Sequence, residues 1–211
     1  MPRTDDRFAT RPRVLRPETT VEQVDEFAKG HKWPMVSVTE RDREAGTDGE
    51  VVWRADGHTV GGQVLRTGSL HYRVDAMFGI GYVSVSGTPK KAVEALASTV
   101  AQALKPWTVE ELCRAFDEAA DPRSQGQAVL RLGLAAPAKP DQEVVKRIRT
   151  ALGDQDARVR YAAVFAASFT GYDEFLTDLR TLADEDPEEF LRDRAAATLR
   201  AMDGAEDGVR V

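Results

Sequence analysis

Two near-copies of one short sequence lie between Ala151 and Met202, and they constrain the fold more than any other feature of the chain. The first copy is Leu152–Ala163, LGDQDARVRYAA. The second begins at Leu182–Pro187, LADEDP, and resumes after a short insertion at Asp193–Ala197, DRAAA. Each copy ends one helical pattern, crosses a short acidic loop and starts an alanine-rich helix that carries an arginine. This arrangement predicts repeated helical hairpins.

The whole C-terminal half follows the same plan. Six helix starts are expected between Thr108 and Met202, since hydroxyl or carboxylate caps precede apolar helical patterns. These starts lie at Thr108–Glu111, Asp121, Asp141, Asp154 or Asp156, Thr170 with Asp173, and Asp186. The second helices of the three pairs align at Gln127, Arg160 and Arg194, which are 33 and 34 residues apart. A period of this length built from paired helices predicts an α-solenoid of three hairpins, in which each pair buries its apolar stripe on its neighbours.

The pattern Asp154-x-Asp156-x-x-Val159-Arg160-x-x-Ala163 resembles HEAT repeats, and Asp186 with Arg194 and Ala195 repeats it less closely. The resemblance covers about residues 108–202. It implies that Asp156, Arg160, Asp186 and Arg194 form a structural ladder between neighbouring repeats. The first pair departs from the pattern, because it has Asp121 and Gln127 but no matching arginine. The family mostly binds proteins, sometimes binds nucleic acids and rarely catalyses reactions, so the resemblance implies architecture more than activity.

The N-terminal half has a different period, and we recognise no family in it. Residues 1–18 are expected to be a flexible arm, and 19–105 an α+β domain. Its predicted helices begin at Thr20, with Gln23 completing a capping box, and at Thr88-Pro89. Its predicted strands are 35–39, 50–55, 58–66, 70–74 and 82–85, with tight turns at Asp56-Gly57 and Thr67-Gly68. The prediction is therefore an antiparallel meander of four or five strands flanked by two helices.

The break at residues 105–107, Lys-Pro-Trp, predicts the domain boundary, so that the helical repeat domain spans 106–202. Residues 203–211 are expected to be a frayed tail. Cutting at residue 105 separates the charges unevenly: the first part has 15 Lys and Arg against 14 Asp and Glu, a net of +1, and the second has 14 against 21, a net of −7. An acidic half does not favour phosphate backbones as partners and is compatible with a basic protein partner.

The composition describes a globular chain, with 42% hydrophobic and 30% charged residues. No apolar run approaches the roughly 18 residues that span a bilayer, and the N-terminus lacks the apolar segment of a signal peptide. The single cysteine, Cys113, excludes an internal disulfide and is expected to be a buried small hydrophobe. These features favour a cytoplasmic protein.

Motifs for catalysis and cofactor binding were sought, and none was found. The chain has no phosphate-binding loop, nucleophile elbow or calcium-binding loop. The three histidines, His31, His58 and His71, are expected to face solvent or a sheet edge, and the acids of the repeat loops are expected to cap helices. We therefore predict no catalytic residue, no metal and no cofactor.

The leading hypothesis is a non-catalytic protein-binding module, either an inhibitor or immunity-type protein or an adaptor, in which a sheet face and the repeat surface contact the partner. The predicted contact residues are Trp53, Met77, Phe78, Ile80, Arg158 and Tyr161. One alternative is a HEAT-like DNA-binding or DNA-glycosylase-type protein, for which Arg147, Arg149, Arg158 and Arg160 would be the basic cluster. A second alternative is an accessory protein that handles a small molecule near Trp53, His71 and Trp107. The sequence leaves the oligomeric state open.

Overall fold

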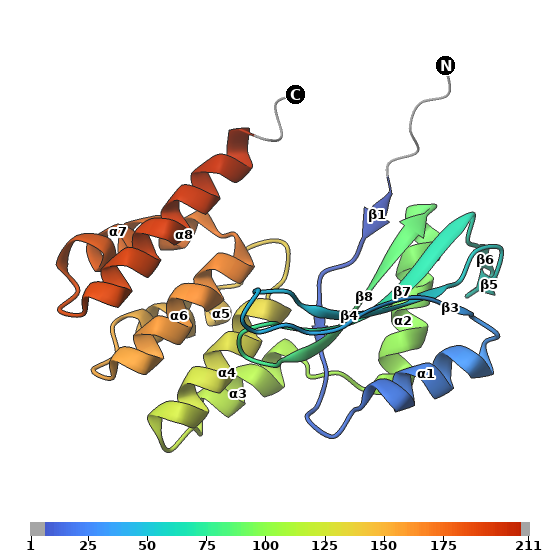
Figure 1. The fold of residues 1–211 in the computed structure, drawn as a ribbon, viewed down its shortest axis with the longest axis horizontal. Helices are drawn as coiled ribbons and strands as arrows, with labels where there is room; N and C mark the ends of the chain where they lie inside the picture. The colour runs from blue at the N-terminus through green and yellow to red at the C-terminus, as the bar shows by residue number, and fades with distance from the viewer. Residues whose placement is uncertain (1–6, 208–211) are drawn as a thin grey trace. The chain divides into compact units, whose positions relative to one another are not determined.

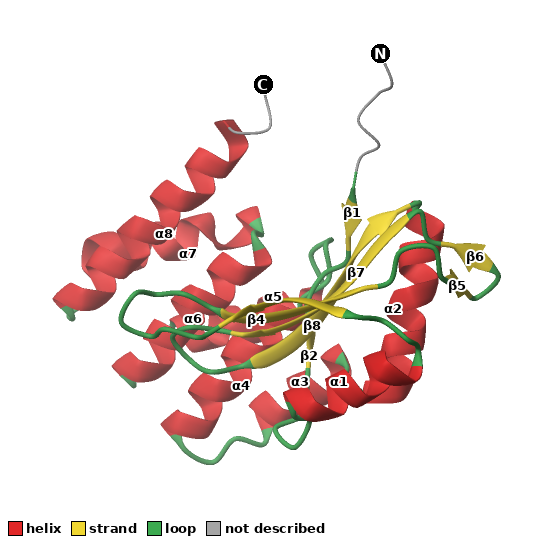
Figure 2. Cartoon of the chain, turned by 45° about the vertical axis from the view of Figure 1, so that its right-hand side comes forward, coloured by secondary structure: helices red, strands yellow, loops and turns green. Residues whose placement is uncertain are grey.

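The computed structural model of the chain describes residues 7–207 and divides it into two compact units, with the boundary between Trp107 and Thr108 (Figure 1). The first unit combines a sheet with helices, and the second consists of helices (Figure 2). The predicted fold class, an α+β part followed by a helical repeat, is therefore confirmed. No described helix has the length and hydropathy required to cross a membrane.

The first unit is built on an antiparallel sheet in the order β1-β8-β7-β4-β3, with β2 also paired to β8. The elements are β1 (Phe8–Ala9), β2 (Arg13–Val14), α1 (Val21–Gly30), β3 (Met35–Thr39), β4 (Gly49–Arg54), β5 (Thr59–Val60), β6 (Gln63–Val64), β7 (Thr67–Val74), β8 (Gly81–Thr88) and α2 (Lys90–Leu104). Trp53 pairs with Leu70, and Leu70 pairs with Val85, so these three side chains share one face of the sheet. They form the core of this unit together with apolar residues of α1 and α2.

The third predicted strand is wrong. Residues 59–64 form a separate two-stranded hairpin, β5-β6, and β7 takes the place beside β4. Gly57 does turn the chain, at φ 73°, but Gly61 and Gly62 also have positive φ and fold the next residues back on themselves. The Asp56 carboxylate accepts the Gly68 N–H at 2.6 Å, which returns the chain to the sheet at Thr67. The predicted turn at Thr67-Gly68 is therefore part of strand β7.

The expected flexible arm also differs from the structure. Phe8–Ala9 and Arg13–Val14 pair with β8, and the buried Val14 carbonyl accepts the Trp107 N–H at 2.9 Å. The part of the arm at residues 1–6 lies outside the described residues. At the other end, the last helix continues to Asp207, past the point where the frayed tail was expected, and residues 208–211 lie outside the described part.

The second unit contains the helices α3 (Val109–Asp117), α4 (Pro122–Ala135), α5 (Gln142–Leu152), α6 (Ala157–Thr170), the 3-10 turn η1 (Asp173–Phe175), α7 (Leu176–Glu185) and α8 (Glu189–Asp207). The predicted caps at Thr108, Asp121, Asp141 and Asp156 are present, and each side chain accepts a backbone N–H of the first turn. The helix expected from Thr170 starts later, because α6 extends to Thr170 and Gly171 ends it in the left-handed conformation.

The second helices of the three pairs pack in sequence, α4 against α6 and α6 against α8. The contact between α4 and α6 is close because Gly133 has no side chain: a Cβ atom there would lie 2.5 Å from the Cα of Ala166. Cys113, which lies on α3, is 6% exposed, and burial raises the pKa of its thiol. The predicted role of Cys113 as a buried small side chain fits this position.

Candidate partner-binding surface

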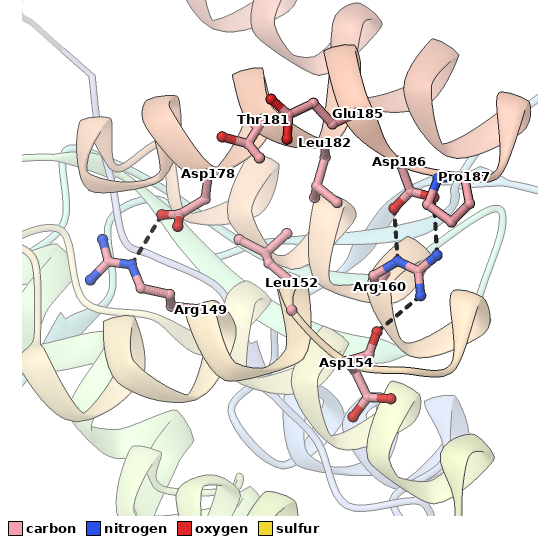
Figure 3. Close-up of a pocket in the computed structure, with 11 residues that line it drawn as sticks. Arg149, Leu152, Asp154, Arg160, Asp178, Thr181, Leu182, Glu185, Asp186 and Pro187 are labelled. Atoms are coloured by element: carbon pink, nitrogen blue, oxygen red, sulfur yellow. Dashed lines mark hydrogen bonds and ion pairs between the residues drawn. The ribbon is translucent and has the colours of Figure 1, made fainter.

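Arg160 joins the second helical pair to the third. Its guanidinium donates to both carboxylate oxygens of Asp186, at 2.7 and 3.0 Å, and its third nitrogen donates to the carbonyls of Asp154 and Gln155 (Figure 3). The side chains are 10% and 1% exposed, so the pair is shielded from water. Burial acts to raise the pKa of Asp186, but the bonds from Arg160 and from the Glu188 N–H lower it overall. The carboxylate therefore stays charged and connects the two repeats.

Arg192, not Arg194, occupies the position equivalent to Arg160 in the last repeat. Arg160 bonds the carbonyls six and five residues before it, and Arg192 does the same with Asp186 and Pro187, at 2.6 and 3.2 Å. The sequence comparison was two residues out because it aligned the second copy by its Ala-rich segment, whereas Arg192 follows Asp186 by six residues, as Arg160 follows Asp154. Arg194 instead lies over the ring of Phe165, 4.7 Å from its centroid.

Asp156 caps its own helix and does not reach a neighbouring repeat. Its carboxylate accepts the Arg158 backbone N–H at 2.8 Å and pairs with the Arg158 guanidinium at 2.6 and 3.0 Å. The hydrogen bond from the Arg158 side chain lowers the pKa of Asp156 to about 2. Both groups are at the surface, where such pairs contribute little to stability. Of the four residues predicted to form the ladder, Arg160 and Asp186 bond to each other between repeats, whereas Asp156 and Arg194 make other contacts.

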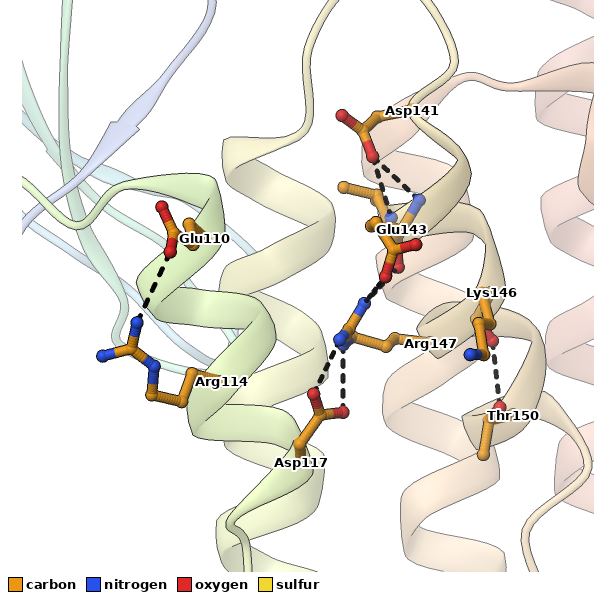
Figure 4. Close-up of polar contacts among 9 residues, drawn as sticks. Glu110, Arg114, Asp117, Asp141, Glu143, Lys146, Arg147 and Thr150 are labelled. Atoms are coloured by element: carbon orange, nitrogen blue, oxygen red, sulfur yellow. Dashed lines mark hydrogen bonds and ion pairs between the residues drawn. The ribbon is translucent and has the colours of Figure 1, made fainter.

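Two further inter-repeat links were not predicted. Arg147 of α5 donates to both oxygens of Asp117 on α3, at 2.6 and 3.0 Å, and also to Glu143, and these bonds raise its pKa (Figure 4). Arg149 donates to Asp178 at 3.0 Å across an open cleft of about 440 Å³ between the second and third pairs (Figure 3). All four arginines of the proposed DNA-binding cluster are therefore paired with carboxylates of the protein itself.

A row of aromatic rings lies along α6. Tyr161, Phe165 and Phe169 follow at four-residue spacing, with ring centroids 5.2 and 6.4 Å apart. Phe190 of α8 adds to the row, 5.6 Å from Tyr161, and is 48% exposed. We name this set, together with Arg158 and Arg194, the second-helix face. Arg158 and Tyr161 were predicted as contact residues. The other members were missed, although the four-residue spacing of the aromatic residues was visible in the sequence.

The predicted contact residues of the first unit differ in how far they are exposed. Trp53 is fully buried, and its indole N–H donates to Asp25 at 3.0 Å, so the prediction that it contacts a partner is wrong. The residue belongs to the core because the strand register turns it toward α1. Ile80 is 8% exposed, Phe78 is half-buried, and Met77 is 37% exposed. The loop at residues 77–80 therefore packs mainly against the protein, and only Met77 is clearly at the surface.

A Ser–His–Glu arrangement lies on the other face of the sheet and was not predicted from the sequence. His71 lies 2.9 Å from Glu50 through Nδ1 and 2.9 Å from the Ser86 hydroxyl through Nε2, and Arg7 donates to the same hydroxyl at 2.9 Å. Burial lowers the pKa of His71, and Arg73 acts in the same direction while Glu50 opposes them. His71 is thus neutral near pH 7 and largely buried on the inner strand β7, whereas the histidines were predicted to face solvent or a sheet edge.

The chemistry of this arrangement is limited by its position. Acyl transfer by a serine also needs backbone or side-chain donors directed at the developing oxyanion. Ser86 lies in the middle of β8, between Ser69 of β7 and Ala9 of β1, where backbone groups serve the sheet ladder. Arg7 connects Ser86 to Ser69. The network therefore fixes the N-terminal strand to the sheet. Among the described residues, no group of three or more His, Cys, Asp or Glu is arranged to hold a metal ion.

In the comparison with known protein families, the family model of HEAT repeats matches residues 109–200. No curated protein and no solved structure matches the chain. The matched segment contains the Arg160–Asp186 link and the whole second-helix face. Over residues 109–200, the second unit is therefore similar to HEAT repeats.

Proposed function

We propose that this chain is a non-catalytic protein-binding module and that the second-helix face is its contact surface. The observation that carries the proposal is the exposed Phe190 packed against the aromatic row of α6. Aromatic and arginine side chains dominate the energetics of protein interfaces, and large apolar side chains at the surface mark contact sites. HEAT repeats also commonly serve as protein-binding scaffolds.

Rigidity supports the same proposal. The second-helix face rests on α6 and α8, which the Arg160–Asp186 link and the Arg192 bonds hold in one arrangement. A surface that is ordered before binding loses less conformational entropy on association. An inhibitor, an immunity-type protein or an adaptor would use such a surface without chemical conversion. We further propose a cytoplasmic location, in keeping with the single cysteine.

The HEAT-like DNA-binding alternative has less support. Its four arginines are already neutralised by Asp117, Glu143, Asp178, Asp156 and Asp186. Binding of a phosphate backbone requires cations that are available to pair with phosphates. A guanidinium already paired with a carboxylate of the protein would first have to break that ion pair.

Affinity capture with the full chain tests the proposal. The wild type is compared with a Tyr161→Ser, Phe190→Ser double variant, and with Lys146→Ser as the control on the exposed side of α5. We expect the same protein to be enriched by the wild type and by the control and lost with the double variant. Equal enrichment by all three chains would refute the assignment of the surface.

A further inference from the structure

The second-helix face is more positive than the acidic half to which it belongs. Helices α4 and α6 carry Arg123, Arg131, Arg158 and Arg160 and contain no Asp or Glu. Most of the acids that give residues 106–211 their net charge of −7 lie on other elements, although α8, which contributes Phe190 and Arg194 to the face, also carries Glu189 and Asp193. The potential that a partner meets depends on the local charges of the contacting face more than on the total.

The two arginines of α4, Arg123 and Arg131, lie on the same side of the helical unit as the aromatic row of α6. Gly126 and Gly133 mark the side of α4 that faces α6, because Cβ atoms there would meet Ala162 and Ala166. Arg123, Gln127 and Arg131 follow at four-residue spacing on the adjoining side. The same helical geometry places Tyr161 and Phe165 of α6 on that side, so the arginines extend the second-helix face.

Two cations of this face, Arg131 and Arg194, are half-buried and form no ion pair with a described residue. Arg123 is exposed, and the Asp121 carboxylate lies close enough for the two charges to interact. Arg194 stacks on Phe165, and its buried Nε has no hydrogen-bond partner among the described residues. A half-buried guanidinium that has lost water without gaining an anion is unsatisfied, and a carboxylate supplies the missing acceptors.

We propose that the second-helix face, extended by Arg123 and Arg131, binds an acidic protein segment that also carries aromatic or aliphatic side chains. The inference rests on the proposed function and adds the chemical class of the partner. Carboxylates pair with Arg123, Arg131 and Arg194, and the apolar side chains pack on Tyr161, Phe165 and Phe190. The net charge alone favoured a basic partner, whereas the contacting face itself complements an acidic one.

A protein segment fits this face better than a nucleic acid. A polyanion needs a continuous series of cations along its backbone. Here the free arginines are few, and the exposed Asp156–Arg158 pair and the exposed Asp193 of α8 place carboxylates beside them. A few carboxylates on a mixed apolar segment match this distribution of charge.

Selection from a displayed library of random peptides on the full chain tests the inference. We expect the selected peptides to contain an excess of Asp and Glu together with aromatic or aliphatic residues. Their affinity, measured by fluorescence anisotropy, should fall about tenfold or more with Arg131→Gln or Arg194→Gln. Arg114→Gln, an exposed arginine on α3, should change it less than about twofold.

The experiment distinguishes failure of the acidic-partner inference from failure of the protein-binding proposal. Arg123→Gln is the second variant, since this exposed side chain can be removed without disturbing the packing, and we expect it to weaken binding too. Selected peptides rich in Lys and Arg, or an oligothymidylate that binds more tightly than the peptides, would overturn the inference. If capture depends on Tyr161 and Phe190 but the captured partner presents a basic segment, the protein-binding proposal stands and the acidic-partner inference fails.

Discussion

At the scale of single residues, arginines of similar appearance in the sequence have different roles. Arg158 and Arg160 lie two residues apart, yet the first pairs with a carboxylate at the surface and the second with a buried one. Removing one partner of a buried pair leaves an uncompensated charge in a poorly solvated site. At the surface, water replaces most of what the pair contributed.

Arg160→Gln should therefore lower the free energy of unfolding of the helical unit by about 3–5 kcal/mol, because Asp186 loses its buried counterion. Arg158→Gln should lower it much less than Arg160→Gln, because water replaces this surface pair. Urea titration followed by the far-ultraviolet circular dichroism signal measures both. Equal losses in the two variants would contradict the assigned link between the repeats.

His71 makes the stability of the first unit depend on pH. The pKa of His71 in the folded protein is lowered by burial, so the unfolded chain binds a proton first, at about pH 6.5. The free energy of unfolding should therefore fall as the pH decreases from about 6.5 to the lowered folded pKa. Loss of the Glu50 interactions belongs to a more acidic range, because the pKa of Glu50 is itself lowered. His71→Gln should flatten the dependence between pH 7 and pH 5.5, as thermal unfolding would measure. An unchanged slope would show that His71 is not the group responsible.

At the scale of secondary-structure elements, the sequence predicted what short-range contacts determine. The caps at Thr108, Asp121 and Asp141 involve residues only two or three positions apart, so the sequence contains the complete signal. Contacts between helices could not be predicted in the same way. The Arg147–Asp117 link spans 30 residues and depends on how two helices are aligned, as does the equivalence of Arg192 with Arg160.

The close packing of α4 against α6 is the clearest contact of this kind, and substitutions at two glycines of α4 test it. Gly133→Ala should destabilise the helical unit by about 1–3 kcal/mol, because the new Cβ would meet Ala166 at 2.5 Å. Gly126→Ala should be neutral or stabilise it by up to about 1 kcal/mol, since its Cβ would lie 3.5 Å from Ala162 and alanine favours a helix. Thermal unfolding of both variants gives the comparison. A stabilising Gly133→Ala would show that the two helices are further apart.

At the scale of the whole molecule, the fold class could be predicted from the change of period along the chain, whereas most of the proposed contact surface could not. The period of 33 to 34 residues predicted the helical repeats, and the family match to residues 109–200 agrees with it. The strand order of the first unit was only partly predictable, because residues 59–64 form a separate hairpin after Gly57 and β7 pairs with β4 instead. Of the six predicted contact residues, Trp53 and Ile80 are buried. Residues that read as exposed strand positions can belong to the core, and only the register decides this.

The central claim is that the second-helix face contacts another protein, and site-specific photocrosslinking tests it most directly. A photoreactive phenylalanine analogue replaces Phe190, which is 48% exposed, and in a matched chain it replaces the exposed Lys146 of α5. The account predicts that position 190 crosslinks one defined protein in a lysate of the native organism, and that position 146 does not. Equal crosslinking from both positions, or from position 146 alone, would contradict it.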